Sequence, residues 1–186
     1  MREQRKYLHS TDIFEQVINL KKNSNLFDLN INFKKQINNL PFLTVNNKPS
    51  QTKQAESNVY FRFKIGKKIF FGYIFQSKKK FINRRGYNEK TFQRKVRMDR
   101  KCVYIPNFDE FNFIEKVTSG AMKFLKRTSP EKRYKWYLAN LNMNKFLKKK
   151  KLKNLKLISI KKTKKIFLFE IISYQDKIGN MLFIKK

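Results

Sequence analysis

The spacing of hydrophobic residues changes between a helical period and a strand period along the chain, and these changes predict its secondary structure. Ile13, Val17 and their neighbours follow a helical period behind the candidate caps Thr11 and Asp12, which predicts a helix that ends near residues 22–24. Hydrophobic residues then alternate with polar ones over residues 27–33, as in a strand with one buried face. The chain is therefore expected to open with a helix followed by a strand.

Residues 34–58 follow neither period. They are rich in Asn, Gln, Lys and Ser and contain Pro41 and Pro49. We interpret this segment as a loop, either ordered against RNA or serving as a mobile linker. Alternation resumes over residues 59–65 and 69–75, which predicts a β-hairpin, and Gly72 in its return strand indicates a bulge or a close backbone approach.

Two helices are expected in the second half of the chain, after a short strand over residues 102–105. Apolar residues at helical spacing predict the first over residues 109–126, with acidic residues at its start and basic residues at its end, as suits the helix dipole. Ser129 and Pro130 match a capping serine followed by proline at the first helical position. They predict a second helix over about residues 130–149.

Apolar segments at residues 155–160, 166–174 and 181–184 are separated by turn residues, which predicts a three-stranded antiparallel meander. The expected fold class is α+β, with an N-terminal helix, a central β-hairpin, two consecutive helices and this C-terminal meander. We expect two domains. Residues 1–58 would hold the first helix, strand and loop, and residues 59–186 would form a basic α+β RNA-binding domain.

The charge balance points to the kind of partner. The 186 residues include 45 Lys and Arg against 13 Asp and Glu, a formal net charge of +32, while 40% hydrophobic residues suffice to build a core. Self-repulsion on this scale predicts a partner with dense negative charge, and nucleic acid carries one phosphate per nucleotide. AT-rich codon usage explains the choice of Lys and Asn, but the same bias permits Glu and Asp. The sign of the charge is therefore informative.

Residues 84–101 are the first candidate RNA contact. Arginine is scarce in this lysine-rich chain but clusters here, and its planar fork binds phosphate through two hydrogen bonds. Tyr87 and Phe92 are interleaved as candidate stacking surfaces, although Phe92 can equally anchor the segment to the core. A solvated basic loop is the alternative. The basic residues are Arg84, Arg85, Lys90, Arg94, Lys95, Arg97, Arg100 and Lys101.

Two lysine runs are further candidates for sequence-independent phosphate contacts. The first ends the predicted long helix and comprises Lys148, Lys149, Lys150 and Lys151. The second forms a predicted β-turn and comprises Lys161, Lys162, Lys164 and Lys165. Either run can instead be a solvated charged surface. Tyr134, Trp136 and Tyr137 are interpreted as core residues rather than as platforms for base stacking.

The sequence shows no pattern typical of a catalytic, metal or cofactor site. A single cysteine, Cys102, and a single histidine, His9, exclude a disulfide framework and a cysteine zinc site. The paired carboxylates or metal-binding aspartates that a nuclease needs are not apparent. We therefore expect a protein that is not an enzyme, binds no cofactor, does not insert into a membrane and is not an independent homo-oligomer.

In bulk character the chain resembles the ribosomal proteins encoded in protist mitochondrial genomes, which are small, very basic and rich in Lys, Asn and Phe. The resemblance is compositional, covers the whole chain and points to no single ribosomal protein family. It implies a structural constituent of the mitochondrial ribosome in the matrix, bound to ribosomal RNA and to neighbouring ribosomal proteins, with a lean to the small subunit. Glu3, Asp12 and Glu15 are atypical of an import presequence, so we expect an organelle-encoded protein.

Two other classes remain open. An intron maturase or homing endonuclease is also basic and organelle-encoded, but it needs acidic metal ligands. A peripheral basic subunit of a respiratory membrane complex would dock on anionic lipid through its lysines. A nuclease assay with magnesium tests the first alternative. Co-sedimentation with ribosomal particles or with membrane complexes separates the ribosomal interpretation from the second.

Overall fold

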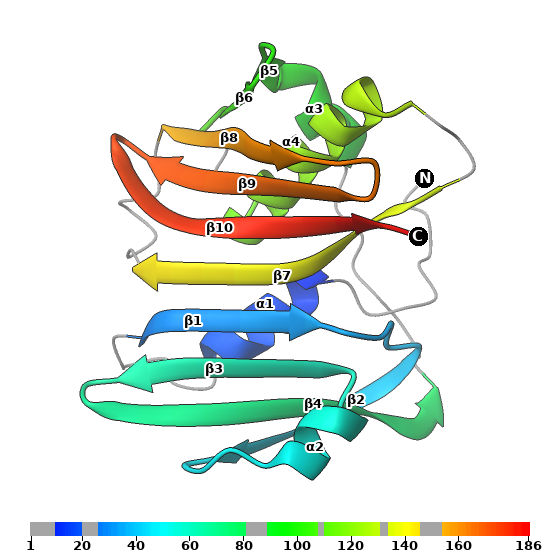
Figure 1. Cartoon of the computed structure of the whole chain (residues 1–186), viewed down its shortest axis with the longest axis vertical. Helices are drawn as coiled ribbons and strands as arrows, with labels where there is room; N and C mark the ends of the chain where they lie inside the picture. Colours follow the sequence, from blue (N-terminus) through cyan, green and yellow to red (C-terminus); the bar gives the residue numbers. More distant parts are fainter. Residues whose placement is uncertain (1–9, 20–25, 81–88, 108–109, 131–133, 146–153) are drawn as a thin grey trace. The chain divides into compact units, whose positions relative to one another are not determined.

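The computed structural model describes residues 10–19, 26–80, 89–107, 110–130, 134–145 and 154–186 (Figure 1). The chain divides into two compact units. The first comprises residues 1–86 with 142–146, and the second comprises residues 87–141 with 147–186. The domain boundary expected at residues 58/59 lies inside the first unit, where the Asn58 amide donates to the Ile74 carbonyl at 2.8 Å.

The first unit combines two helices with four strands in the order β2-β4-β3-β1. Its elements in chain order are α1 (Ser10–Asn19), β1 (Leu26–Phe33), β2 (Asn39–Asn46), α2 (Gln51–Glu56), β3 (Val59–Ile65) and β4 (Lys68–Lys80). The pairs β1–β3, β3–β4 and β2–β4 are antiparallel. The predicted N-terminal helix, first strand and central hairpin are all present, and α1 buries Ile13, Phe14 and Val17 as its spacing predicts.

The hairpin explains why residue 72 is glycine. Gly72 pairs with Phe61 across β3 and β4, and the Phe61 ring lies over the glycine backbone. A Cβ atom at this position would meet three Phe61 ring carbons at 2.0–2.5 Å. The predicted close approach at Gly72 is therefore an aromatic ring packed in the core, since Phe61 is fully buried.

The loop expected over residues 34–58 is wrong, because the segment holds β2 and α2. β2 lies at one end of the strand order, where Pro41 can be tolerated since an edge strand has no partner on one side. α2 is capped by the Ser50 side chain, which accepts from the Lys53 amide, and it buries none of its residues. With no apolar stripe, a helix of six residues leaves no periodic signal in the sequence.

The second unit holds two helices and six strands in the order β7-β10-β9-β8-β6-β5. Its elements are α3 (Glu89–Lys95), β5 (Arg97–Met98), β6 (Cys102–Ile105), α4 (Phe113–Thr128), β7 (Trp136–Lys145), β8 (Leu155–Lys162), β9 (Ile166–Ser173) and β10 (Asp176–Lys185). The division between the units falls within β7, after Leu141. The pairs β5–β6, β6–β8, β8–β9 and β9–β10 are antiparallel.

α4 supplies the helical side of this core, and in Figure 1 it lies behind the strands β8 and β9. Its Phe124 makes edge contacts with Phe167 and Phe169 of β9, at ring-centroid distances of 6.2 and 5.6 Å. The helix begins at Phe113, later than expected, because Asn112 and Glu115 form a capping box. The Asn112 side chain accepts from the Glu115 amide, and the Glu115 carboxylate accepts from the Asn112 amide.

The helix expected over residues 130–149 is wrong. Residues 136–145 form strand β7, so α4 is followed by a strand and the two consecutive helices expected here are not present. The three C-terminal strands are present, yet they are the middle of a larger sheet, flanked by β7 on one side and β6 on the other. The α+β fold class is therefore corrected: the described residues form ten strands and four helices, a mainly antiparallel β structure.

Candidate anion-binding site

The turn between β8 and β9 presents four exposed lysines, and its backbone is held without their side chains. The Thr163 amide donates to the Ile166 carbonyl at 2.8 Å. The Thr163 hydroxyl accepts from the amides of Lys165 and Ile166 at 3.3 and 3.0 Å. Because threonine and backbone groups form the turn, the side chains of the exposed residues Lys161, Lys162, Lys164 and Lys165 are available for a ligand.

Two other segments come to the same edge of the second unit. The Lys185 amide at the end of β10 donates to the Lys165 carbonyl at 2.9 Å. Lys186 and Lys135, the latter just before β7, exchange two backbone hydrogen bonds of 3.0 and 3.1 Å. We call this edge the basic rim; it consists of Lys135, Lys161, Lys162, Lys164, Lys165, Lys185 and Lys186.

Aromatic rings accompany the basic rim. The Lys185 ammonium lies 4.7 Å from the centroid of the Tyr134 ring and 5.9 Å from that of Trp136. The Lys162 ammonium lies 5.6 Å from the centroid of Phe167. The half-buried Trp136 meets Phe167 edge to face at 5.3 Å, which places its ring against β9, whereas Tyr134 is 52% exposed. Lysine and aromatic ring therefore adjoin at the surface, held by cation–π attraction.

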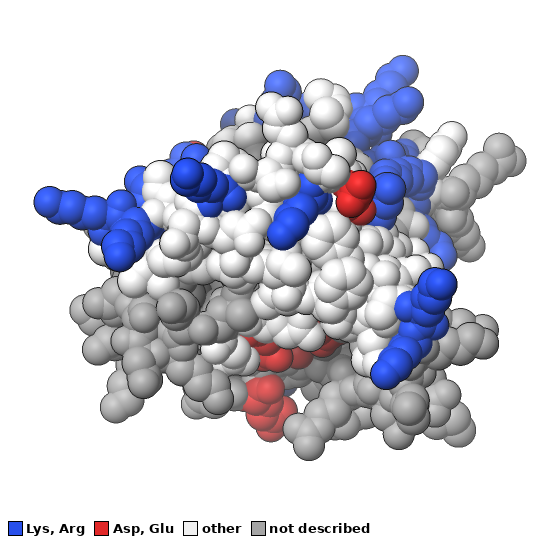
Figure 2. All heavy atoms as spheres, turned by 90° about the horizontal axis from the view of Figure 1, so that it is seen from below, with Lys and Arg blue, Asp and Glu red and all other residues white. Residues whose placement is uncertain are grey.

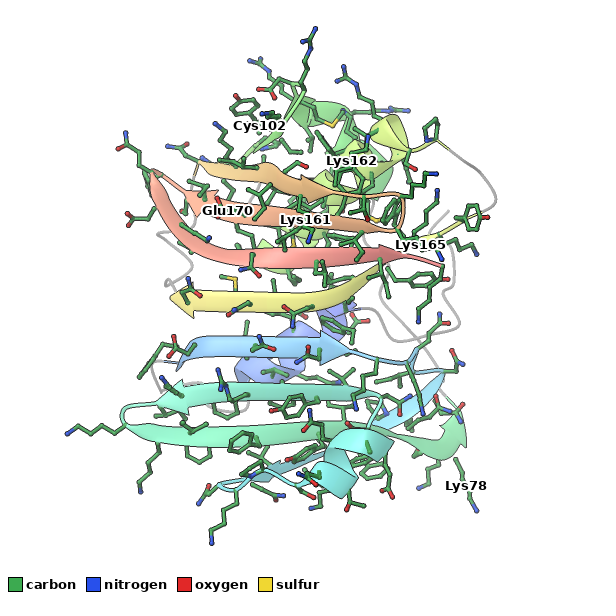
Figure 3. The ribbon with its side chains drawn as sticks, in the orientation of Figure 1. Lys78, Cys102, Lys161, Lys162, Lys165 and Glu170 are labelled. Carbon is green, nitrogen blue, oxygen red and sulfur yellow. The ribbon has the colours of Figure 1, made fainter. Side chains whose placement is uncertain are left out.

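Acids are few near the basic rim in sequence: Glu131 precedes Lys135 by four residues, and Glu170 and Asp176 lie on β9 and β10. No Asp or Glu occurs between residues 132 and 169. Glu170 follows on β9, farther from the turn in Figure 3 than the labelled Lys161, Lys162 and Lys165, and its carboxylate accepts from Lys177. In the first unit, Lys64 forms an ion pair with Asp28 at 2.7 Å. The seven side chains that define the rim are all cationic, so together they attract an approaching anion.

The described part of the predicted arginine cluster lies on α3, on β5 and in the turn that joins β5 to β6. Arg94, Lys95, Arg97, Arg100 and Lys101 are all exposed. Arg84, Arg85 and Tyr87 lie outside the described residues, as do Lys148, Lys149, Lys150 and Lys151. Phe92 is buried, with its ring 5.0 Å from that of Phe111, so it anchors α3 to the core.

One acid partly offsets the charge of this cluster. Asp99 accepts hydrogen bonds from the amides of Lys101 and Cys102 at 2.8 and 2.7 Å, and from the Tyr104 hydroxyl at 3.0 Å. The two backbone donors lower the pKa of Asp99 below 3.8, because they stabilise the charged carboxylate. The hydrogen bond to Asp99 in turn raises the pKa of Tyr104 above 10.0.

The cluster and the basic rim adjoin along β8. The Ser159 amide donates to the Lys101 carbonyl at 2.8 Å, two residues before the rim begins at Lys161. β6 then pairs with β8 from Cys102 opposite Ile158 onward. The structure therefore brings together two groups of residues, Arg100 with Lys101 and Lys161 with Lys162, that the sequence analysis treated as separate candidates.

Sequence reasoning missed three members of the rim and its exposed ring. Lys135 and Tyr134 fell within a segment that was expected to be helical, so Tyr134 was assigned to the core. Lys185 and Lys186 were not considered, because their approach to Lys165 depends on the pairing of β10 with β9. The alternation of Tyr134, Trp136 and Leu138 was the available sign of a strand.

The described residues contain no group of three His, Cys, Asp or Glu side chains placed to hold a metal ion. No helix among them is both long and apolar enough to span a membrane.

No protein-family model matches the chain, and a search of curated proteins finds no match. Among solved structures, similarity is found to a fusion DH domain, with 9% identity, a TM-score of 0.47, and 97% of this chain and 79% of the other covered. A tesB protein of Mycobacterium avium subspecies paratuberculosis is similar with 6% identity and a TM-score of 0.44, and the match covers 97% of this chain and 86% of that protein. An acyl-ACP thioesterase of Bacteroides thetaiotaomicron is similar with 9% identity and a TM-score of 0.41, and the match covers 97% of this chain and 91% of that protein.

These neighbours correct the functional expectation. They are named as thioesterases and a DH domain, and none of the three is named as a ribosomal or RNA-binding protein. The prediction of a non-enzymatic structural constituent of the mitochondrial ribosome is contradicted by them, and we withdraw it together with its rivals. With TM-scores of 0.41–0.47, these likenesses do not by themselves assign an activity to this chain.

Proposed function

We propose that the second unit binds a phosphate-bearing polyanion through the basic rim. One observation carries this proposal: seven lysines from three separate segments converge on one edge. Lysine ammonium groups are hydrated point charges that suit phosphate contacts without demanding one geometry. A flexible ligand with repeating negative charge can therefore engage several of them at once.

The arginine cluster extends the proposed surface. Arg100 and Lys101 precede β6 and adjoin β8, so a ligand on the rim can continue onto them. Arg94 and Arg97 are exposed on α3 and β5 and can add bidentate contacts. The Asp99 carboxylate accepts its hydrogen bonds from the Lys101 and Cys102 amides and the Tyr104 hydroxyl, not from the guanidinium groups of Arg94 and Arg97.

Three ligands that share phosphate chemistry test the proposal. Inorganic polyphosphate, an oligonucleotide and vesicles rich in anionic lipid would each be titrated into the full chain while the fluorescence of Trp136, the single tryptophan, is followed. We expect saturable binding to at least one of them that weakens as salt rises. Equal and weak responses to all three and to uncharged dextran, unchanged by salt, would refute the proposed function.

A further inference from the structure

We infer that the polyanion is a single strand of nucleic acid, with Tyr134 as a platform on which one base stacks; this inference rests on the proposed function. The main support for this inference is the exposed Tyr134 ring beside the lysines of the basic rim. Tyr134 is 52% exposed, and the Lys185 ammonium lies 4.7 Å from its ring centroid. An aromatic face next to a phosphate-binding cation matches a nucleotide, which joins a planar base to a phosphate.

The position of Tyr134 suits this role because neighbouring groups fix its surroundings. Lys135 and Lys186 exchange two backbone hydrogen bonds directly beside it. The Lys185 ammonium also lies 3.5 Å from the Ser129 hydroxyl, which ties it to the end of α4. The ring therefore stands on ordered backbone, so a stacking base meets a surface whose position is already set.

Competing ligands use less of this site. Polyphosphate and lipid headgroups bring phosphate but no planar base, so they gain nothing from Tyr134. In a duplex the bases already stack on one another and are paired, so their faces are not available to a side chain. A single strand, with either ribose or deoxyribose, is the polyanion that can engage lysine and ring together.

The experiment compares oligothymidylate with an abasic oligomer of the same number of phosphates, using the full chain. We expect the base-bearing strand to bind roughly 5- to 150-fold more tightly, the range expected for one stacked base. Tyr134→Leu should bring the ratio of the two affinities close to one, whereas Tyr134→Phe should keep the advantage of the base-bearing strand. Phe42→Leu is the matched control, because Phe42 is 50% exposed and lies in the first unit.

The outcomes separate the two proposals. Failure of both oligomers, of polyphosphate and of anionic vesicles to bind would overturn the proposed function itself. Equal binding of the two oligomers by the wild-type chain would retain the basic rim but refute the base platform, and this comparison needs no variant. Binding to anionic vesicles with no response to oligothymidylate would also refute the inference, since it would identify a lipid surface as the partner.

Discussion

The charge of the basic rim can be reduced without touching its backbone, which gives a quantitative prediction. Lys161, Lys162, Lys164 and Lys165 would be changed together to Gln. The turn should persist, because Thr163 and backbone groups hold it. Each phosphate contact on a single strand contributes about −0.7 to the slope of log K against log salt, so seven contacts give about −4.9 and the remaining three give about −2.1.

These slopes translate into a large difference in salt sensitivity. Between about 50 and about 200 mM salt, the wild-type chain should lose about 900-fold in affinity and the variant about 18-fold. Fluorescence anisotropy of a labelled oligothymidylate across this range measures both slopes. The far-ultraviolet circular dichroism of the variant should match that of the wild type.

The matched control removes the same charge elsewhere. Lys48, Lys67, Lys68 and Lys78 are exposed in the first unit and would also be changed to Gln. In Figure 2, Lys and Arg side chains lie above and on both sides of a largely uncharged centre, and Asp or Glu side chains lie below it. Lys78 is labelled in Figure 3. We expect the control to keep a slope near −4.9. Equal reductions in both variants would mean that net charge alone governs binding and that the rim has no special role.

Three further predictions concern the fold. Gly72→Ala should destabilise the first unit by about 1–3 kcal/mol, because its Cβ would clash with the buried Phe61 ring, and Phe61→Leu should partly rescue it in thermal unfolding. Asn112→Ala should cost about 1 kcal/mol in denaturant unfolding, since it removes the α4 cap. The pKa of the Asp99 carboxyl, followed by NMR, should lie below 3.8. Its stabilisation of the turn is therefore present above that pH and is lost as the pH falls through the folded pKa. Asp99→Asn should abolish this acid dependence and lower the pKa of Tyr104 toward 10.0. An unchanged melting temperature, an unchanged denaturant midpoint, or an ordinary Asp99 titration would refute the respective argument.

The elements with one clear period were predictable from the sequence. β1, β3, β9 and much of β8 and β10 alternate between buried and less buried positions, and β6 occupies residues 102–105 as expected. In each of these segments one face meets the core, so the spacing of apolar residues records the structure directly.

β7 was mistaken for a helix because the spacing between its buried residues changes from three positions to two along the strand. Leu138 is buried, the next buried residue is Leu141, and Met143 follows two positions later. A step of three followed by a step of two imitates helical spacing, and Ser129 with Pro130 supplied a convincing helix start. Local signals could not reveal that β10 offers this segment a strand partner.

The candidate site was predictable only in part, for a similar reason. The lysines at 161–165 form one run in the sequence, so their role as a charged turn could be anticipated. Lys135 and Lys185 are separated from them by long stretches of chain, and backbone hydrogen bonds across the sheet bring them to the same edge. Sites assembled by strand pairing leave no local pattern in the sequence.

Assembly of the basic rim from distant segments links ligand occupancy to folding. The lysines meet only when β8, β9, β10 and the start of β7 are in place, so the unfolded chain offers no equivalent surface. A polyanion at a free concentration one hundred times its Kd would raise the free energy of unfolding by about 2.7 kcal/mol. Without it, mutual repulsion among the gathered ammonium groups opposes closure of the same strands. The abundance of the partner would thereby set how long the chain survives proteolysis in the cell.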